Sequence, residues 1–109
     1  LDHGIFLTVA ENLIGNAARY AKSELSIKVV LEKDHLLLKI SDDGPGYSSA
    51  LIQNGPRPFE TASSNSAHFG MGLYSSRLLC EKHGGKLILE NQSPAGATAT
   101  AVFQLSFKP

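Results

Sequence analysis

Hydrophobic residues recur three and four positions apart over the first twenty residues of the chain, which is the spacing of one buried helix face. Asp2 stands where a helix N-cap is expected. The pattern predicts a helix from Asp2 to about Ala21. Its buried face comprises Ile5, Phe6, Val9, Leu13, Ala17 and Ala21. A second stripe at the same spacing is formed by Thr8, Asn12, Asn16, Arg19 and Tyr20.

Two β-rich segments follow this helix, at residues 25–32 and 36–41, and three polar residues join them. Such an arrangement predicts a hairpin. The run Asp-Asp-Gly-Pro-Gly at residues 42–46 ends the second strand. Periodicity is then lost over residues 47–69, apart from a short helical turn expected near residues 48–53. A loop of that length inside a compact domain is usually functional or mobile.

The last third of the chain regains a regular pattern. Residues 70–83 predict a second helix, closed by the glycine pair at 84–85. Residues 85–91 and 98–107 predict two more strands, joined by a turn at residues 93–96. We therefore expect one α/β (α+β) domain, a two-layer sandwich of a mixed, mostly antiparallel sheet with helices on one face.

Length, charge and cysteine content narrow the class of protein. The chain has 109 residues, which suits a single domain over 1–109, and its ten basic residues balance ten acidic ones. This balance gives no bulk electrostatic case for nucleic acid or an anionic membrane. No apolar run reaches the roughly 20 residues that span a bilayer. The single cysteine, Cys80, favours a reducing compartment and a core position. Because the first residue is not Met and no signal peptide precedes the helix, we expect a fragment of a longer protein.

The polar helix stripe is the first candidate site. Asn12, Asn16 and Arg19 follow one another at helical steps and can point two amides and a guanidinium in one direction. Amide oxygens suit Mg²⁺, and a guanidinium suits phosphate. A solvated helix face is the alternative.

Two glycine-containing segments are the other candidates. Asp42 can accept a hydrogen bond from the exocyclic amine of adenine, and Gly44 and Gly46 let the backbone approach a flat ring. An ordinary turn is the alternative. The segment Gly70-Met71-Gly72-Leu73, expected at a helix start, can offer N–H groups to phosphate, although glycine is common at helix ends. The spacing fits neither a Walker loop nor a dinucleotide fingerprint, and no zinc spacing or nucleophile elbow is present. A catalytic Ser-His-Asp triad remains an alternative at this point.

The order of these segments is more specific than any one of them. NLIGNAARY, DDGPG, a long loop, GMGL, HGG and GAT occur in succession and cover nearly the whole chain. In this order they resemble the GHKL ATPase superfamily, and within it the sensor histidine kinases. The resemblance implies the Bergerat ATP-binding fold, with one or two N-terminal strands lying before residue 1.

The resemblance also implies a role for each candidate residue. Asn16 would ligate Mg²⁺, Asn12 would line the phosphate site, Arg19 would reach the phosphates and Tyr20 would pack near the adenine or ribose. Asp42 would accept from the adenine amino group and share a water with Thr98, in a pocket shaped by Gly44 and Gly46. The triphosphate and the second helix would be seated by Gly70, Met71, Gly72 and Leu73.

Residues 47–69 would form the ATP lid, with Phe59 as its aromatic residue and Arg57 as its only fixed cation. His68 and Phe69 depart from the family pattern, which usually places a glycine and a small residue there. These departures from the family pattern bear on lid closure and on ATP binding.

Asn12 separates the subfamilies. Relatives that hydrolyse ATP carry a glutamate there as general base, and an amide cannot take a proton. Glu11 is adjacent, but one helix step turns it about 100° away. A neutral imidazole needs no base, so we expect transfer of the ATP γ-phosphoryl group to a histidine on a separate dimerisation domain.

The expected cofactors are therefore ATP and Mg²⁺, and a response regulator is expected downstream. The fragment is expected to be cytoplasmic, without nucleic-acid or membrane contact, in a parent that can be an inner-membrane sensor. The alternatives are an anti-sigma type serine kinase and a degenerate domain kept for docking, as His68 suggests.

Overall fold

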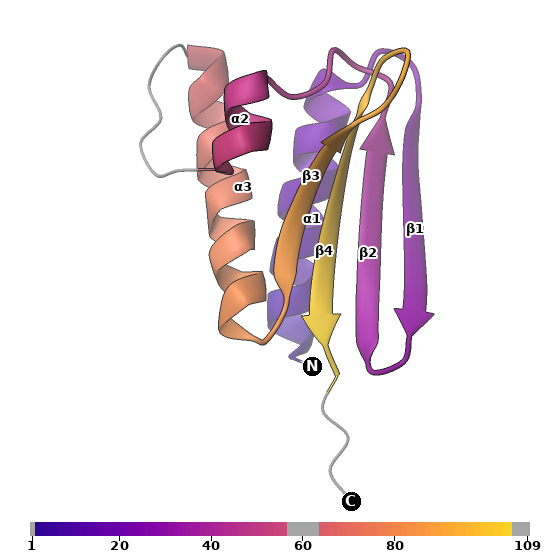
Figure 1. Cartoon of the computed structure of the whole chain (residues 1–109), viewed down its shortest axis with the longest axis vertical. Coiled ribbons are helices and arrows are strands. Elements are labelled where there is room, and N and C mark those ends of the chain that lie inside the picture. The colour runs from indigo at the N-terminus through magenta and orange to yellow at the C-terminus, as the bar shows by residue number, and fades with distance from the viewer. Residues whose placement is uncertain (1, 57–63, 106–109) are drawn as a thin grey trace, which may run out of the picture.

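The computed structural model describes residues 2–56 and 64–105, and the side chains of residues 64–71 are outside that description. It has a sheet on one side and helices on the other (Figure 1). This confirms the predicted two-layer α/β sandwich. In chain order the elements are α1 (His3–Tyr20), β1 (Leu25–Glu32), β2 (His35–Asp42), α2 (Ser49–Asn54), α3 (Ser64–Lys82), β3 (Lys86–Asn91) and β4 (Ala97–Gln104).

The four strands form one sheet in the order β1-β2-β4-β3, and each neighbouring pair is antiparallel. Within the described residues the sheet is therefore antiparallel throughout, not mixed as we expected. The central pairing joins β2 to β4, with Ile40 opposite Ala99 and Asp42 opposite Ala97. Because β4 lies between β2 and β3 and is antiparallel to both, the last residues of β2 and β3 and the first residues of β4 lie at the same end of the sheet.

Helix α1 follows its predicted pattern closely. The side chain of Asp2 accepts hydrogen bonds from the backbone N–H groups of Gly4, at 2.7 Å, and Ile5, at 3.2 Å. This cap satisfies donors that have no partner within a helix. The predicted face lies against β2 and β4, with Val9, Leu13 and Ala17 buried. The helix ends at Tyr20, one residue before the predicted end.

The hairpin and the short helix are also confirmed, with small shifts. The link between β1 and β2 is two residues, because His35 already pairs with Glu32, and Lys33 takes a positive φ of 54° in the turn. Ser48 caps α2 by accepting a hydrogen bond from the N–H of Leu51 at 3.1 Å. These local signals were readable because each depends on neighbouring residues alone.

Helix α3 begins at Ser64, six residues before the predicted start at Gly70. Residues 64–69 contain neither glycine nor proline, so nothing in the backbone prevents the helix from starting early. Gly70, Met71 and Gly72 therefore lie inside the helix, where N–H groups bond to carbonyls four residues back. Our expectation that they stand at a helix start was wrong.

The core lies between the helices and β2, β4 and β3. It includes Leu73 and Cys80 of α3, and Phe103, whose ring centroid is 5.5 Å from that of Phe6 in α1. Small side chains on the helix side of β4, Ala97, Ala99 and Ala101, let the helices approach the sheet closely.

Strand β1 is covered less than its neighbour. Ile27, Val29 and Leu31 share the helix side of the sheet with Ile40, Leu38 and Leu36, their partners in β2. The three side chains of β1 are 52–67% exposed, whereas Leu38 and Ile40 are each 2% exposed. Helices α1 and α3 thus cover β2, β4 and β3 and leave an apolar stripe on β1. In residues 2–56 and 64–105, no helix has the length and apolar character needed to cross a bilayer.

Candidate functional site

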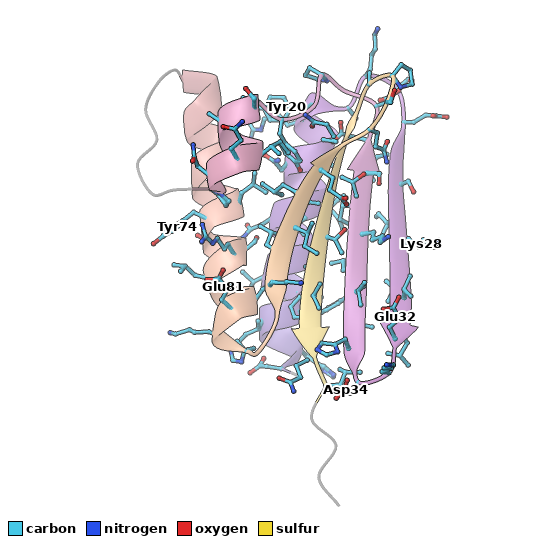
Figure 2. All side chains as sticks on the ribbon, viewed as in Figure 1. Tyr20, Lys28, Glu32, Asp34, Tyr74 and Glu81 are labelled. Atoms are coloured by element: carbon cyan, nitrogen blue, oxygen red, sulfur yellow. The ribbon has the colours of Figure 1, made fainter. Side chains whose placement is uncertain are left out.

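The last residues of the polar stripe on α1 and the Asp42–Gly46 turn lie at the same end of the molecule. Helix α1 and strand β2 both finish there, and Figure 1 shows the two ends side by side with the loop that leads to α2. Figure 2 labels Tyr20, the last residue of α1, at this end, and Asp34 at the opposite end. Asp42 alternates with the buried Ile40 and so lies on the helix side of β2. We expected the amides of α1 and Asp42 to face one another across a single cleft, but Asn12 and Asn16 line one hollow and Asp42 lines another, so the single cleft stays a prediction.

A hollow of about 230 Å³ lies between α1 and α3. The polar stripe of α1 forms one side of it and α3 contributes the other. Its lining consists of Glu11, Asn12, Gly15, Asn16, Arg19 and Gly72. The amide Nδ2 of Asn12 also lies 3.4 Å from the hydroxyl of the fully buried Ser76 in α3. Three predicted residues of the stripe thus meet a predicted glycine across the two helices.

Glu11 is a lining residue that our sequence analysis set aside. Its neighbour Asn12 is half-buried, whereas Glu11 and Arg19 are exposed at the rim. One helix step of about 100° turns the Cα–Cβ bond of Glu11 away from the direction of Asn12. The side chain of Glu11 is nevertheless long enough to reach the rim of the shallow hollow. The hollow therefore carries one carboxylate and one guanidinium besides its two amides.

Asp42 ends β2 in a buried position. Its side chain is 8% exposed, and its Oδ1 accepts a hydrogen bond from the N–H of Gly44 at 2.8 Å. Desolvation raises the pKa of this carboxyl above its ordinary value, the Gly44 N–H works against that shift, and the charge of Asp43 adds to it. A carboxylate held in such a place is poised to accept a further hydrogen bond.

Asp43, the next residue, is held by hydrogen bonds from the loop between α1 and β1. Its carboxylate accepts hydrogen bonds from the N–H groups of Lys22, Ser23 and Glu24, and from the hydroxyl of Ser23 at 2.6 Å. These bonds lower the pKa of Asp43 well below its ordinary value, the Ser23 hydroxyl contributing most. Asp43 therefore fastens the α1–β1 loop to the end of β2. Its sequence signal was only that Asp in a turn often accepts from backbone N–H groups.

Gly44 is fixed by close packing with α1. A Cβ on this residue would overlap the carbonyl oxygen of Tyr20 and come 2.9 Å from Oδ1 of Asp42. Next to it lies a mostly apolar hollow of about 370 Å³. That hollow is lined by Tyr20, Lys22, Asp43, Gly44, Pro45 and Ala95. The glycine is thus required by the fold, and the same packing brings Tyr20 beside the turn.

Tyr47 and Asn91 complete this end of the sheet, and sequence reasoning missed both. Tyr47 is 8% exposed, and burial raises the pKa of its hydroxyl, with a further contribution from the charge of Asp42. The side chain of Asn91 accepts from the N–H of Tyr47 at 2.7 Å and donates to its carbonyl at 2.9 Å. Gly46, which directly precedes Tyr47, has a φ of 86°.

Residues 2–108 match the family model described as histidine kinase-, DNA gyrase B-, and HSP90-like ATPase. The chain belongs to this family. It is 34% identical over 105 residues to the sensor protein kinase CarS of Pseudomonas aeruginosa, covering 93% of this chain and 22% of that protein. It is 35% identical over 92 residues to the sensor protein CseC of Streptomyces avermitilis, covering 79% and 17%. The domain thus spans about a fifth of the length of these relatives.

Solved structures agree on the fold of this ATPase domain. The catalytic domain of histidine kinase ThkA superposes with a TM-score of 0.81 at 22% identity, over 98% of this chain and 70% of that one. The histidine kinase AdeS of Acinetobacter baumannii gives 0.73 at 23%, over 97% and 48%. The domain has the sequence and the fold of the ATP-binding catalytic domain of a sensor histidine kinase.

Thr98 is the clearest correction to the ATPase site that we predicted. Ala97, not Thr98, stands opposite Asp42, and Thr98 stands opposite Ser41. Side chains alternate between the faces of a strand, so Thr98 lies on the side of the sheet away from the helices. There its hydroxyl is 3.0 Å from that of Ser41 and accepts from the side chain of Gln92 at 2.7 Å. A water shared by Asp42 and Thr98 does not fit this register.

The residues of the second glycine-containing segment, residues 70–73, do not all lie in the hollow of the ATPase domain. Leu73 is 1% exposed and packs in the core, so it seats α3 and does not line the hollow. Gly72 lines the hollow, and its contact with the triphosphate stays a prediction. The side chains of Met71 and His68 fall outside the described part, as do residues 57–63, which include Arg57 and Phe59 of the expected lid.

Proposed function

We propose that this domain is the catalytic part of a longer sensor histidine kinase, and that it transfers the γ-phosphoryl group of ATP to a histidine on a separate dimerisation domain. A response regulator would then receive the phosphoryl group. Two observations support this proposal: the family match, and relatives that are named as a sensor protein and a sensor protein kinase and are about five times longer. We place the domain in the cytoplasm, where ATP is available, whether or not the parent is anchored in a membrane.

The hollow between α1 and α3 carries the proposal. Asn12, Asn16 and Arg19 line it together with Gly72. Glycine in a helix interior costs about 1 kcal/mol relative to alanine. A Cβ on Gly72 would meet nothing within 4 Å, so packing among the described residues does not call for glycine. Close approach of a triphosphate to the helix supplies a reason for it.

Asp42 is the proposed purine contact. Its buried carboxylate uses one acceptor position for Gly44 and has capacity for another donor. A carboxylate accepts from the exocyclic amine of adenine and repels the carbonyl that guanine carries at the same ring position. Tyr20, in the apolar hollow beside Gly44, is the proposed wall for the base or the ribose.

The described residues suit Mg²⁺ only as a companion of the nucleotide. No group of three or more His, Cys, Asp or Glu that could hold a metal occurs within 2–56 and 64–105. Mg²⁺ commonly binds through one or two protein oxygens plus substrate phosphates and waters. The side-chain oxygen of Asn16 would hold it in that manner. The ion would neutralise phosphate charge during transfer.

The residues of the chain would then contribute by positioning the nucleotide. The two amides and Arg19 would orient the triphosphate, and Asp42 would fix the base, so that the γ-phosphoryl group points away from the domain toward its acceptor. Asn12 cannot take a proton, which suits an imidazole acceptor because neutral imidazole is already nucleophilic. One observation favours a second candidate. The carboxylate of Glu11 at the rim of the hollow could serve as the base that a serine acceptor needs.

Calorimetric titration with ATP and Mg²⁺ tests the binding part of this proposal. Asp42→Asn should weaken binding at least about tenfold, since hydrogen bonds to charged groups contribute about 1.5–3 kcal/mol. Asn16→Ala should remove the dependence of affinity on Mg²⁺. Asp34→Asn makes the same change as the first variant at the far end of the molecule and should leave binding unaltered. Binding by both site variants at the strength of the unaltered domain would refute the site.

The acceptor requires a second measurement in the full-length parent. Phosphohistidine is lost in acid and phosphoserine survives it, so acid treatment of the labelled protein separates the two candidates. Glu11→Gln should leave histidine phosphorylation intact and should abolish phosphorylation of a serine acceptor.

A further inference from the structure

Asn91 is the last residue of β3, and its carboxamide bonds to the backbone of a distant segment. Its Oδ1 accepts from the N–H of Tyr47 at 2.7 Å, and its Nδ2 donates to the carbonyl of the same residue at 2.9 Å. The amide thus pairs with Tyr47 in the way that a neighbouring strand would. Neither the family match nor the sequence pattern assigns this residue a role.

The sheet register explains why this contact reaches the nucleotide site. Asn91 stands opposite Ala97 in β4, and Ala97 stands opposite Asp42 in β2. Directly paired residues share a face, so Asn91 and Asp42 lie on the helix side with only the methyl group of Ala97 between them in that row. Tyr47 lies five residues after Asp42 in the chain. The turn between the two residues brings the backbone of Tyr47 to the side chain of Asn91.

The turn from Asp42 to Tyr47 is closely fitted against Asn91. Gly46 has a φ of 86°, and a Cβ there would come 2.8 Å from Oδ1 of Asn91 and 3.2 Å from the carbonyl of Gly96. A Cβ on Gly96 would overlap the carbonyl of Asp42. The β3–β4 connection therefore holds both ends of the turn that carries Asp42.

We propose that Asn91 is a positioning residue of the nucleotide site, which sets the Asp42–Tyr47 turn so that the Asp42 carboxylate meets the purine. The inference rests on the proposed function and deepens it. Tyr47 supports it, because this buried ring lies near enough to Asp42 for the carboxylate charge to influence its hydroxyl. Releasing the backbone of Tyr47 would let both side chains shift.

The test uses Asn91→Ala in the whole domain, with Mg²⁺ and three probes: ATP, GTP and inorganic tripolyphosphate. The variant loses two hydrogen bonds, so we expect ATP affinity to fall about five- to tenfold. Preference for ATP over GTP should fall by the same factor, and affinity for tripolyphosphate should stay unchanged. Gln104→Ala is the matched control, since it removes an exposed amide from the last residue of β4, opposite His35 at the other end of the sheet, and should not alter any probe.

A double variant shows whether Asn91 acts through Asp42. Adding Asn91→Ala to Asp42→Asn should cost no further ATP affinity, because the group that Asn91 places is already disabled. If Asn91→Ala did not fold, Asn91→Asp, which keeps the acceptor for the Tyr47 N–H, would enter the same comparison.

The outcomes separate the two proposals. If the unaltered domain bound no ATP, the proposed function would fail before Asn91 was tested. If it bound ATP and Asn91→Ala left ATP affinity and base preference unchanged, the positioning role would be wrong. It would also be wrong if tripolyphosphate affinity fell as much as ATP affinity, because that result would indicate a general loosening of the domain.

Discussion

Asp42 and Asp43 are consecutive in the chain, yet their carboxylates are held in opposite ways. Asp42 points to the helix side, is 8% exposed and accepts one N–H, from Gly44. Asp43 accepts from three successive N–H groups and a hydroxyl in the α1–β1 loop. The pKa of Asp42 is raised and that of Asp43 is lowered. One carboxylate is kept at a cost to the fold, and the other stabilises it.

Asp42→Asn should not destabilise the nucleotide-free domain at neutral pH and should raise its melting temperature. A raised pKa means that the fold favours the protonated form, so the contribution of Asp42 is present below the ordinary pKa of Asp and lost as the pH rises through the raised pKa. The variant removes a buried charge and can still accept from Gly44. Thermal melts across the acidic range should show the advantage shrinking as Asp42 becomes protonated. A lower melting temperature for the variant at neutral pH would contradict this.

Asp43→Asn should behave in the opposite way. Its lowered pKa means that the stabilisation is present above the ordinary pKa of Asp and is lost as the pH falls through the lowered one. The variant should therefore melt at a lower temperature than the unaltered domain at neutral pH. The difference in melting temperature between Asp43→Asn and the unaltered domain should become smaller only under strongly acidic conditions. Equal melting at neutral pH would show that the bonds to residues 22–24 contribute nothing.

Much of the fold could be predicted because its signals are local. The Asp2 cap, the hydrophobic face of α1 and the paired segments of the hairpin each depend on residues near one another in the chain. The start of α3 could not be placed, because a polar run such as residues 64–69 suits both a loop and an exposed helix end. Only tertiary packing decides between the two.

The site was predictable where it lies on one helix. The stripe of Asn12, Asn16 and Arg19 requires only helical geometry, and these residues do line one hollow. Thr98 was misplaced because the register between β2 and β4 is a long-range property, and a shift of one residue moves a side chain to the other face. Asn91 was missed for the same reason, since its partner Tyr47 lies 44 residues away.

Cys80 should be inert to thiol reagents while the domain is folded. The residue is fully buried in α3, and burial raises the pKa of its thiol to about 11, with the charge of Glu81 adding to the shift. The thiolate is the reactive form, so labelling at neutral pH should be at least about 100-fold slower than in the unfolded chain. Ellman's reagent with and without denaturant measures this. Labelling of the folded domain at the unfolded rate would show that α3 opens readily.

Gly72→Ala should stabilise the fold and weaken nucleotide binding, which separates the two roles of a helical glycine. Alanine is favoured over glycine in a helix by about 1 kcal/mol, and a Cβ on Gly72 meets nothing within 4 Å in the described structure. Ser75→Ala is the matched control. Ser75 is an exposed residue of the same helix and, unlike Gly15, does not line the hollow.

Both alanine variants should be more stable in denaturant unfolding, Gly72→Ala by about 1 kcal/mol and Ser75→Ala by about 0.5 kcal/mol. Only Gly72→Ala should lose affinity for ATP with Mg²⁺, because its new methyl group would occupy the proposed triphosphate position, whereas Ser75→Ala changes an exposed position outside the hollow. Equal affinity in the two variants would place the triphosphate elsewhere. A loss of stability at Gly72 would mean instead that the glycine is required by packing, and the strongest argument for a ligand in this hollow would be removed.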